Sequence, residues 1–170
     1  SFGAEVPFLR DKSLADDFTG TFAVVKDAYL KLKDSFSSLD TVCCIYATAP
    51  LLKAKHLQEA YNLMQNAHAK SVISICEFPF PIQRAFVKDD NGNLSYREPK
   101  FAPMRSQDLQ KCYQDCGLFY FYDKSCFEYS KDYQSIGYAM PRHRVIDIDT
   151  PEDWDYACAM AKAVEELKLD

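Results

Sequence analysis

A short, almost unbroken apolar run at Thr41–Ala47 limits what this chain can fold into more than any other segment. Its composition, Thr-Val-Cys-Cys-Ile-Tyr-Ala, is typical of a parallel strand that helices cover on both faces. The run stops at Thr48-Ala49-Pro50, and a second apolar run occupies Ser71–Cys76. Between the two runs, helical spacing links Leu57, Ala60, Tyr61 and Met64. We therefore expect a βαβ unit in this part of the chain.

The same alternation of helices and strands continues on both sides of this unit. After the small residues Thr19-Gly20-Thr21, helical spacing predicts a first helix. Its apolar face would carry Phe22, Val25, Tyr29, Leu32 and Phe36. Further strands are expected at Gly117–Tyr122 and Val145–Ile148. A last helix should start at Thr150-Pro151-Glu152-Asp153 and bury Trp154, Ala157, Cys158, Ala161 and Val164. The pattern indicates the α/β class with a mostly parallel sheet.

Length and composition favour one domain with a sizeable core. The chain has 170 residues, of which 48% are hydrophobic, and no apolar run approaches the ~20 residues of a membrane span. A net charge of −5 disfavours a general nucleic-acid surface but permits a small anionic substrate held by local arginines. The seven cysteines include Cys43 and Cys44 in the first apolar run, where they are expected to be buried and reduced. We expect a cytoplasmic protein whose partners include neither a membrane nor a nucleic acid.

Residues 79–103 do not fit a compact layer. Four prolines, at positions 79, 81, 99 and 103, surround the turn-forming sequence Asp89-Asp90-Asn91-Gly92-Asn93. This pattern predicts an extended arm or hairpin. Because an isolated hairpin is at best marginally stable in water, we expect the arm to pack across a homodimer, with a simple disordered loop as the alternative.

Two carboxylates stand two residues apart at Asp147 and Asp149, just before the last helix. In a strand, residues i and i+2 share a face, so these carboxylates should project together while Ile146 and Ile148 face the core. Their Cα atoms would lie about 6.6 Å apart, near enough for both side chains to reach one Mg²⁺ directly or through its waters. The alternative is a helix-capping aspartate with a solvated neighbour.

Two of the three histidines, His56 and His68, are assigned no role, and the role of His143 is left open. His56 and His68 are expected on polar faces of a helix, and His143 in a solvated loop between Arg142 and Arg144. For His143 the alternative is a contact with a phosphate group.

Four phrases, in their order along the chain, resemble the cytidylyltransferases that activate nonulosonic acids. They are Gly3-Ala-Glu-Val-Pro-Phe-Leu-Arg10, Tyr46-Ala-Thr-Ala-Pro-Leu51, Arg105-Ser-Gln-Asp-Leu109 and Ile146-Asp-Ile-Asp-Thr-Pro-Glu-Asp-Trp154. Within this family, Glu77-Phe-Pro-Phe-Pro-Ile-Gln-Arg-Ala-Phe86 is most similar to the branch that acts on pseudaminic acid. Sialic acid enzymes usually carry Gln-Pro-Thr-Ser-Pro in place of the Tyr-Ala-Thr-Ala-Pro phrase, which weakens that assignment.

The resemblance implies a three-layer, Rossmann-like nucleotidyltransferase sheet and a specific reaction. CMP would pass from CTP to the anomeric hydroxyl of an acidic nine-carbon sugar, with release of pyrophosphate. Pseudaminic acid is the expected sugar, and legionaminic acid and sialic acid are the alternatives. The hydroxyl would attack the α-phosphate in line, with catalysis mostly from positioning and from a Mg²⁺ ion on the catalytic residues Asp147 and Asp149.

The resemblance also implies residues that bind the nucleotide. Arg10 matches an arginine at the nucleotide, and Thr19 and Thr21 match small residues that contact the cytosine. The alternatives are a surface position for Arg10 and a helix-capping role for Thr21.

A second set of residues is expected to hold the sugar acid. Arg105 and Gln107 match family residues at this position, and a guanidinium can fork onto a carboxylate. Tyr46 and Thr48 are expected to line the sugar pocket, although the turn that contains them is equally a strand terminator. For Arg105 the alternative is a surface ion pair with Asp108.

Members of the family open with a strand and a loop rich in glycine, arginine and lysine that cradles the triphosphate. The five glycines of this chain are not clustered, so no such cradle can be proposed. We therefore expect residues 1–170 to form a single domain that lacks its first βαβ portion, with the arm at 79–103 inside it. The non-enzymatic alternative is a dimerising fragment, and no pyrophosphate release is expected from residues 1–170 alone.

Overall fold

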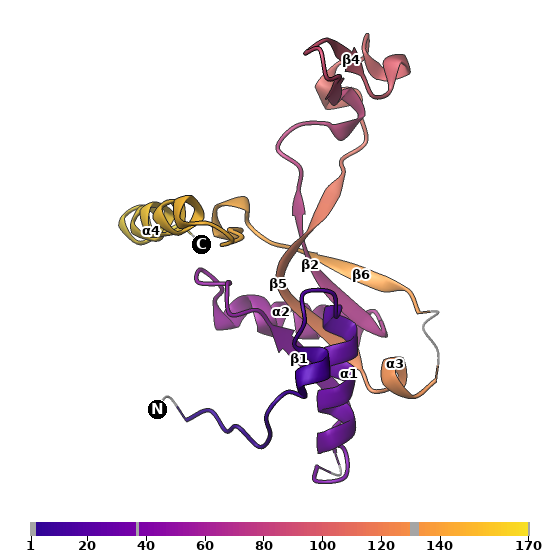
Figure 1. Cartoon of the computed structure of the whole chain (residues 1–170), viewed down its shortest axis with the longest axis vertical. Coiled ribbons are helices and arrows are strands. Elements are labelled where there is room, and N and C mark those ends of the chain that lie inside the picture. The colour runs from indigo at the N-terminus through magenta and orange to yellow at the C-terminus, as the bar shows by residue number, and fades with distance from the viewer. Residues whose placement is uncertain (1–2, 37, 130–132, 170) are drawn as a thin grey trace.

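The molecule is built around a four-stranded sheet, as a computed structural model shows for residues 3–36, 38–129 and 133–169 (Figure 1). Across the sheet the order is β1, β5, β2 and β6, with bounds Thr41–Ile45, Tyr113–Asp123, Ser71–Glu77 and Ser135–Ala139. The α/β class is confirmed. Three strands run the same way, but β5 returns from the arm between β1 and β2 and is antiparallel to both, so only β2 and β6 form a parallel pair. The expectation of a mostly parallel sheet is therefore correct in that three of the four strands point the same way. It is not correct for the hydrogen-bonded pairs, of which only one is parallel.

Three of the four expected strands are present, and one is not. β1, β2 and β5 lie where the apolar runs predict, and β6 was not predicted. The expected strand at Val145–Ile148 is wrong, because this segment pairs with no strand among the described residues. Its alternation is nevertheless real: Ile146 is buried, and Asp147 and Asp149 are exposed. An alternation of apolar and polar residues predicts an extended segment with one buried face. It does not predict that the segment pairs with a neighbouring strand.

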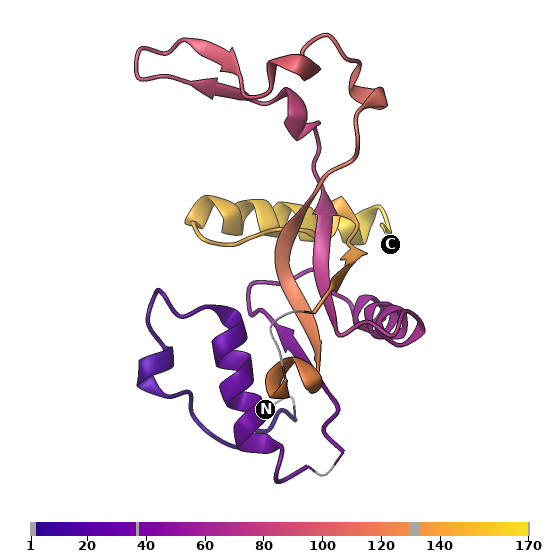
Figure 2. The same cartoon turned by 90° about the vertical axis from the view of Figure 1, so that its right-hand side faces the viewer.

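Helices cover both faces of the sheet and give the three expected layers. α1 (Thr21–Leu32) and the short α3 (Ser125–Glu128) lie on one face, and α2 (Ala54–Asn66) lies on the other (Figure 2). Alternate residues of β5 enter the two cores, since Phe119 and Phe121 pack on the α2 side and Tyr122 on the α1 side. No helix in the described ranges is long and apolar enough to cross a membrane.

The predicted first helix is present but ends earlier than expected. Its N-cap is Gly20, from the expected small-residue segment, and Val25 and Tyr29 form the buried face. Phe36 lies beyond the end of the helix and is 53% exposed. Helical spacing therefore predicts the start of this helix better than its end.

A β-bulge interrupts the pairing of β2 with β5. The register shifts between Ile73 and Ile75, and on β5 Gly117 has φ of 61°, in the left-handed region that favours glycine. The hydroxyl of Ser74, a fully buried residue, accepts hydrogen bonds from the backbone N–H groups of Leu118 (3.3 Å) and Phe119 (3.0 Å). These bonds satisfy donors that the irregular ladder would otherwise leave unpaired.

α4 (Pro151–Glu166) begins where the sequence predicts. Thr150 is its N-cap and forms a reciprocal capping box with Asp153. The expected buried stripe is only partly correct: Ala157 and Val164 are buried, whereas Trp154 is 58% exposed. The reason is that the main contact of α4 is with the short 3-10 helix η5 (Arg142–Arg144) and not with the sheet, so a narrower face is covered.

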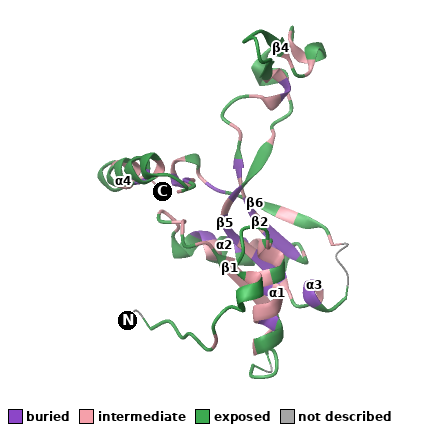
Figure 3. Ribbon diagram, in the orientation of Figure 1, coloured by how far each residue is buried: buried purple, intermediate pink, exposed green. Residues whose placement is uncertain are grey.

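A protruding arm, residues 78–112, connects β2 to β5 and extends beyond the predicted 79–103 at both ends (Figure 1). Its hairpin pairs β3 (Phe86–Lys88) with β4 (Leu94–Tyr96), as the turn sequence predicts. In the turn, the Asp89 carboxylate accepts hydrogen bonds from the backbone N–H groups of Asn91 (3.0 Å) and Asn93 (2.7 Å). Three 3-10 helices complete the arm: η2 (Ile82–Arg84), η3 (Pro99–Phe101) and η4 (Ser106–Asp108). Figure 3 shows that the arm is almost entirely exposed or half-buried, whereas buried residues gather in the sheet.

Candidate functional site

Four residues predicted to bind the nucleotide or the sugar line one cavity at the carboxyl end of β1. The cavity has a volume of about 380 Å³, and Arg10, Thr19, Thr21 and Tyr46 all contribute to its wall. Arg10 precedes the 3-10 helix η1 (Lys12–Leu14), the two threonines flank the N-cap of α1, and Tyr46 follows β1. They meet because α1 packs against β1. The remaining wall consists of Val24, Val25, Cys44, Ile45 and Ala47.

Two hydroxyl groups of the cavity wall are bonded to each other, and the ring of one adjoins a further tyrosine outside the wall. The hydroxyls of Thr21 and Tyr46 are hydrogen-bonded to each other. The ring of Tyr46 lies 5.6 Å from that of Tyr120, whose hydroxyl donates to both carboxylate oxygens of Asp115 at 3.0 and 2.9 Å. Burial, followed by the hydrogen bond to Asp115, raises the pKa of Tyr120 well above its usual value. Tyr120 is therefore a neutral hydrogen-bonding group near pH 7, and the hydroxyls of Thr21 and Tyr46 are suited to orienting a ligand by hydrogen bonds.

Arg10 supplies positive charge at the same cavity. Its charge opposes the effect of burial on the Cys44 thiol, whose pKa is nevertheless raised above its usual value. For the adjacent Cys43, burial raises the pKa to about 12. Both thiols therefore stay protonated near neutral pH and are poor nucleophiles. The cavity can bind an anion beside Arg10, but it offers no thiolate for covalent chemistry.

The four residues predicted to hold the sugar lie in two separate places. Tyr46 lines the cavity, and Thr48 lies in the turn two residues later but not in the cavity wall. Arg105 and Gln107 belong to the arm, where Arg105 forms a bidentate ion pair with Asp108 at 2.7 and 3.0 Å. Figure 1 shows the arm extending away from α1 and β1. Within one chain, the structure does not bring the two pairs together.

Asp147 and Asp149 are exposed, and neither forms an ion pair within the described part of the chain. Figure 2 shows the start of α4, which follows them, on the side of the sheet where α1 lies. No group of three or more histidine, cysteine, aspartate or glutamate side chains at metal-binding spacing occurs among the described residues. Two free carboxylates nevertheless fit Mg²⁺, which commonly takes one or two protein carboxylates together with substrate phosphates and water.

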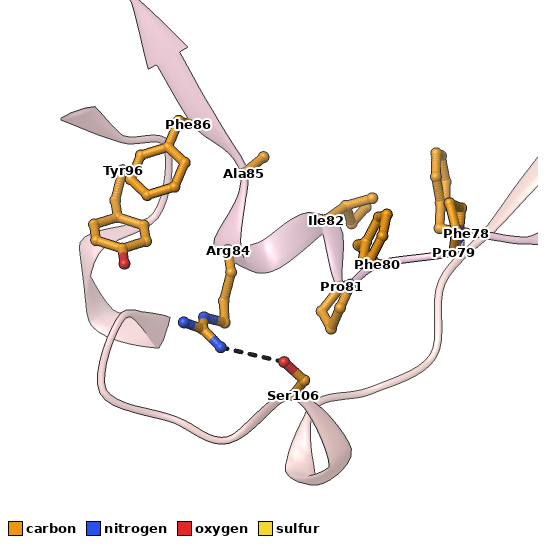
Figure 4. Close-up of a pocket in the computed structure, with 10 residues that line it drawn as sticks. All are labelled: Phe78, Pro79, Phe80, Pro81, Ile82, Arg84, Ala85, Phe86, Tyr96 and Ser106. Carbon is orange, nitrogen blue, oxygen red and sulfur yellow. Dashed lines mark hydrogen bonds between the residues drawn. The ribbon is translucent and has the colours of Figure 1, made fainter. Parts of the chain in front are cut away.

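The base of the arm contains an apolar groove of about 400 Å³ (Figure 4). Aromatic and proline side chains dominate its wall, and Arg84 donates a hydrogen bond from Nη1 to the Ser106 hydroxyl (3.2 Å) at one edge. Phe80 is 77% exposed there. Exposed aromatic surface of this kind marks an interaction site. The sequence predicted an arm in need of a partner, but not this groove.

Sequence reasoning missed the burial of two basic residues, His56 and Arg144. His56, expected on a polar helix face, is 1% exposed, and its Nδ1 accepts a hydrogen bond from the Lys53 N–H (3.2 Å) at the start of α2. Burial, followed by the charge of Arg144, lowers the pKa of His56. Arg144 itself is 2% exposed. Three consecutive basic residues stand directly before the apolar Val145-Ile146, but the sequence does not show which of them is buried.

His143 is also less solvated than the sequence suggests. It is half-buried beside α4, and its Nε2 atom is buried without a hydrogen-bond partner among the described residues. Burial lowers the pKa of His143, and the charge of Arg144 adds to this effect. The expected solvated loop is therefore wrong for this side chain, because η5 turns it toward α4.

The chain is similar in sequence to known cytidylyltransferases. No family model matches the chain. The chain is 40% identical over 169 residues to the pseudaminic acid cytidylyltransferase of Campylobacter jejuni serotype O:2, covering 97% of this chain and 72% of that protein. The CMP-N,N'-diacetyllegionaminic acid synthase of Legionella pneumophila is 27% identical, with 99% and 72% covered. A solved structure of 4-diphosphocytidyl-2C-methyl-D-erythritol synthase from Anaerococcus prevotii has a TM-score of 0.49 at 15% identity, covering 79% of this chain and 64% of that one.

Proposed function

This chain belongs to the pseudaminic acid cytidylyltransferase family, and from that premise we propose where its substrates bind. The reaction of the family is the transfer of CMP from CTP to the sugar acid, with release of pyrophosphate. We place the nucleotide in the cavity at the end of β1 and the reacting phosphate near Asp147 and Asp149. The observation that carries this proposal is the convergence of Arg10, Thr21 and Tyr46 on one cavity.

Within this cavity each group has a distinct task. The Arg10 guanidinium attracts the anionic nucleotide and fixes it by charge-assisted hydrogen bonds. The hydroxyls of Thr21 and Tyr46, which already bond to each other, offer hydrogen bonds to the polar edge of a base. Val24 and Ile45 provide apolar contacts for the faces of the base.

We propose that Asp147 and Asp149 hold Mg²⁺ together with phosphate oxygens of CTP. When bound, the ion offsets negative charge on the α-phosphate and helps to orient the leaving pyrophosphate. The two carboxylates suit this task because both are exposed and neither is committed to an ion pair within the described ranges. Both carboxylates are exposed while Ile146 is buried, so both are accessible to one ligand.

The arm supports a homodimer in which each chain completes the site of the other. Arg105 and Gln107 lie on the arm, away from the cavity of their own chain, so we propose that they reach the sugar acid in the partner's site. The apolar groove beside η2 offers surface for that association. The free state of all seven cysteines supports the proposed cytoplasmic location.

The test is a pyrophosphate-release assay on the full-length protein with CTP, Mg²⁺ and, in separate reactions, pseudaminic, legionaminic and sialic acid. We expect turnover with pseudaminic acid. Arg10→Ala should raise the KM for CTP about 10-fold or more, because a charge-assisted contact is lost. The matched control is Lys124→Ala, an exposed cation paired with Asp40 outside both the cavity and the arm. An unchanged KM for CTP in the Arg10 variant would remove the cavity from consideration.

A further inference from the structure

The segment that carries Asp147 and Asp149 is fixed to α4 at its C-terminal end. The Asp153 carboxylate accepts hydrogen bonds from the backbone N–H groups of Asp149 (3.1 Å) and Thr150 (2.8 Å). In return, the Thr150 hydroxyl accepts one from the Asp153 N–H (3.2 Å). The last of the two proposed metal ligands therefore has its backbone held by the first turn of the helix.

The N-terminal end of the same segment is fixed to the other end of α4 through Arg144. Its Nη2 atom donates a hydrogen bond of 2.6 Å to the Leu169 carbonyl, just beyond the last turn of the helix. A cation at this position is also favoured by the helix dipole. Between the two attachments Ile146 is 5% exposed. Residues 144–150 thus have both ends attached to α4, and Ile146 is buried between the two attachments.

Arg144 also attaches this segment to the loop that borders the nucleotide cavity. Its Nη1 atom donates a hydrogen bond of 3.0 Å to the Leu51 carbonyl, in the connection that runs from Tyr46 to the start of α2. One guanidinium therefore joins two segments that are 93 residues apart in the sequence. These segments carry Tyr46 on one side and Asp147 and Asp149 on the other.

The chemistry of this contact indicates that Arg144 fixes the relative position of two segments more than it stabilises the fold. Arg144 is 2% exposed, and within the described part of the chain its partners are two backbone carbonyls and no carboxylate. Burying a guanidinium is costly, and an apolar side chain of similar volume often stabilises a core at least as well. What an apolar side chain cannot supply is a rigid planar fork that fixes two backbones relative to each other.

We propose that Arg144 is a positioning residue that sets Asp147 and Asp149 relative to the nucleotide cavity. The proposal rests on the proposed metal site. Misplacing catalytic groups by about 1 Å can cost about 100-fold in rate, so a residue that holds both segments influences turnover without touching substrate. Asp153, at the opposite end of the same segment, has a weaker version of this role.

The test compares Arg144→Lys, Arg144→Gln and Asp153→Ala in the full-length protein. Lysine keeps the charge but lacks the fork, so both Arg144 variants should raise the Mg²⁺ concentration for half-maximal turnover about 10-fold and lower kcat about 10- to 100-fold. Mg²⁺ binding measured by calorimetry with CTP and no sugar should weaken in parallel. Asp153→Ala, whose side chain lies at the surface, should move both quantities less and in the same direction.

The control for a purely structural role is Met64→Ala, a core substitution in α2 at a residue that is 2% exposed. It should lower the melting temperature and leave the Mg²⁺ dependence unchanged. The proposal is overturned if the folded Arg144 variants keep the wild-type Mg²⁺ dependence, even if they melt earlier. If Asp147→Asn also leaves Mg²⁺ binding unchanged, the metal site fails together with the proposal. Loss in Asp147→Asn alone rejects only the role of Arg144.

Discussion

The sheet buries its phenylalanine side chains, whereas the arm exposes them. In the sheet, Phe119 is fully buried and Phe121 is 6% exposed. In the arm, residues 78–112, Gln83 is the single buried residue, while Phe80 is 77% and Phe86 is 54% exposed. A core stabilises its own chain, whereas exposed aromatic surface is stabilised only by covering it with something else. The aromatic residues of the sheet are therefore covered within one chain, whereas those of the arm are left exposed for the partner that we propose.

The largest expected effect separates these two kinds of aromatic residue. Phe119→Ala should lower the free energy of unfolding by about 3–5 kcal/mol, because it leaves a cavity in the main core. Phe86→Ala should change it by less than about 1 kcal/mol in a monomer but weaken self-association. Urea unfolding and analytical ultracentrifugation measure the two quantities. Equal losses of stability in both variants would break the comparison.

Deleting residues 88–96 extends this test to the whole hairpin. If the arm mediates dimerisation, the deletion should give a monomer whose sheet still folds cooperatively, because this segment contributes no buried residue. Sedimentation velocity and thermal melting report both properties. A monomeric wild-type protein would contradict the dimer on which this expectation depends.

The next effect concerns chemistry in the sheet domain, where the proposed metal ligands lie. Asp147→Asn and Asp149→Asn keep shape and remove charge, so each should reduce turnover about 100-fold or more and raise the Mg²⁺ requirement. Stability should change by no more than the ~1 kcal/mol of a cap substitution. Turnover against Mg²⁺ concentration, beside melting curves, checks this. A loss of stability with an unaltered Mg²⁺ response indicates that the pair is structural.

A smaller effect is expected at the bulge that joins the two regions. Gly117→Ala should cost about 1–2 kcal/mol, because a side chain disfavours φ of 61°. A methyl group added at this glycine or at Gly20 would meet no other atom within 4 Å, so the cost at Gly117 comes from the backbone alone. Gly20→Ala, at φ of −67°, is the matched control and should cost less. Thermal unfolding of both variants decides whether the backbone conformation is needed.

The smallest effect is a pH dependence confined to the arm. Hydrogen bonds from the Asn93 side chain and backbone hold the pKa of Asp89 below its ordinary value of 3.8. A lowered pKa contributes stability above the ordinary value and loses it as pH falls through the lowered one. The hairpin turn should therefore loosen below about pH 4, seen as faster amide exchange at Asn91 and Asn93, before the sheet unfolds. Asp89→Ala should remove this acid dependence, and an unchanged profile would contradict it.

The sequence predicted most of the elements that rely on local signals. The apolar runs located β1, β2 and β5, and the capping box located the start of α4. These features depend on a few neighbouring residues. The insertion of β5 between β1 and β2 depends on contacts far apart in the chain, and so does β6, whose edge position beside β2 leaves only a weak alternation.

The candidate site was also predictable only in part, because some of its contacts depend on residues far apart in the chain. Arg10, Thr19, Thr21 and Tyr46 were named from the sequence, and the structure places them in one cavity. The burial of Arg144 was not predictable, because its carbonyl partners at Leu51 and Leu169 have no side-chain signature in the sequence. Backbone acceptors become visible only when the fold is known.

The β-bulge at Ser74 lies in the sheet, where the two strands that carry the arm pair irregularly. β2 and β5 both continue from the sheet into the arm, so a small rotation at their irregular crossing is magnified along the arm before it reaches the hairpin and η4. Two hydrogen bonds to one buried hydroxyl limit that rotation. In the proposed dimer, the accuracy with which one chain presents Arg105 to the other therefore depends on Ser74, a buried residue of the sheet far from Arg105.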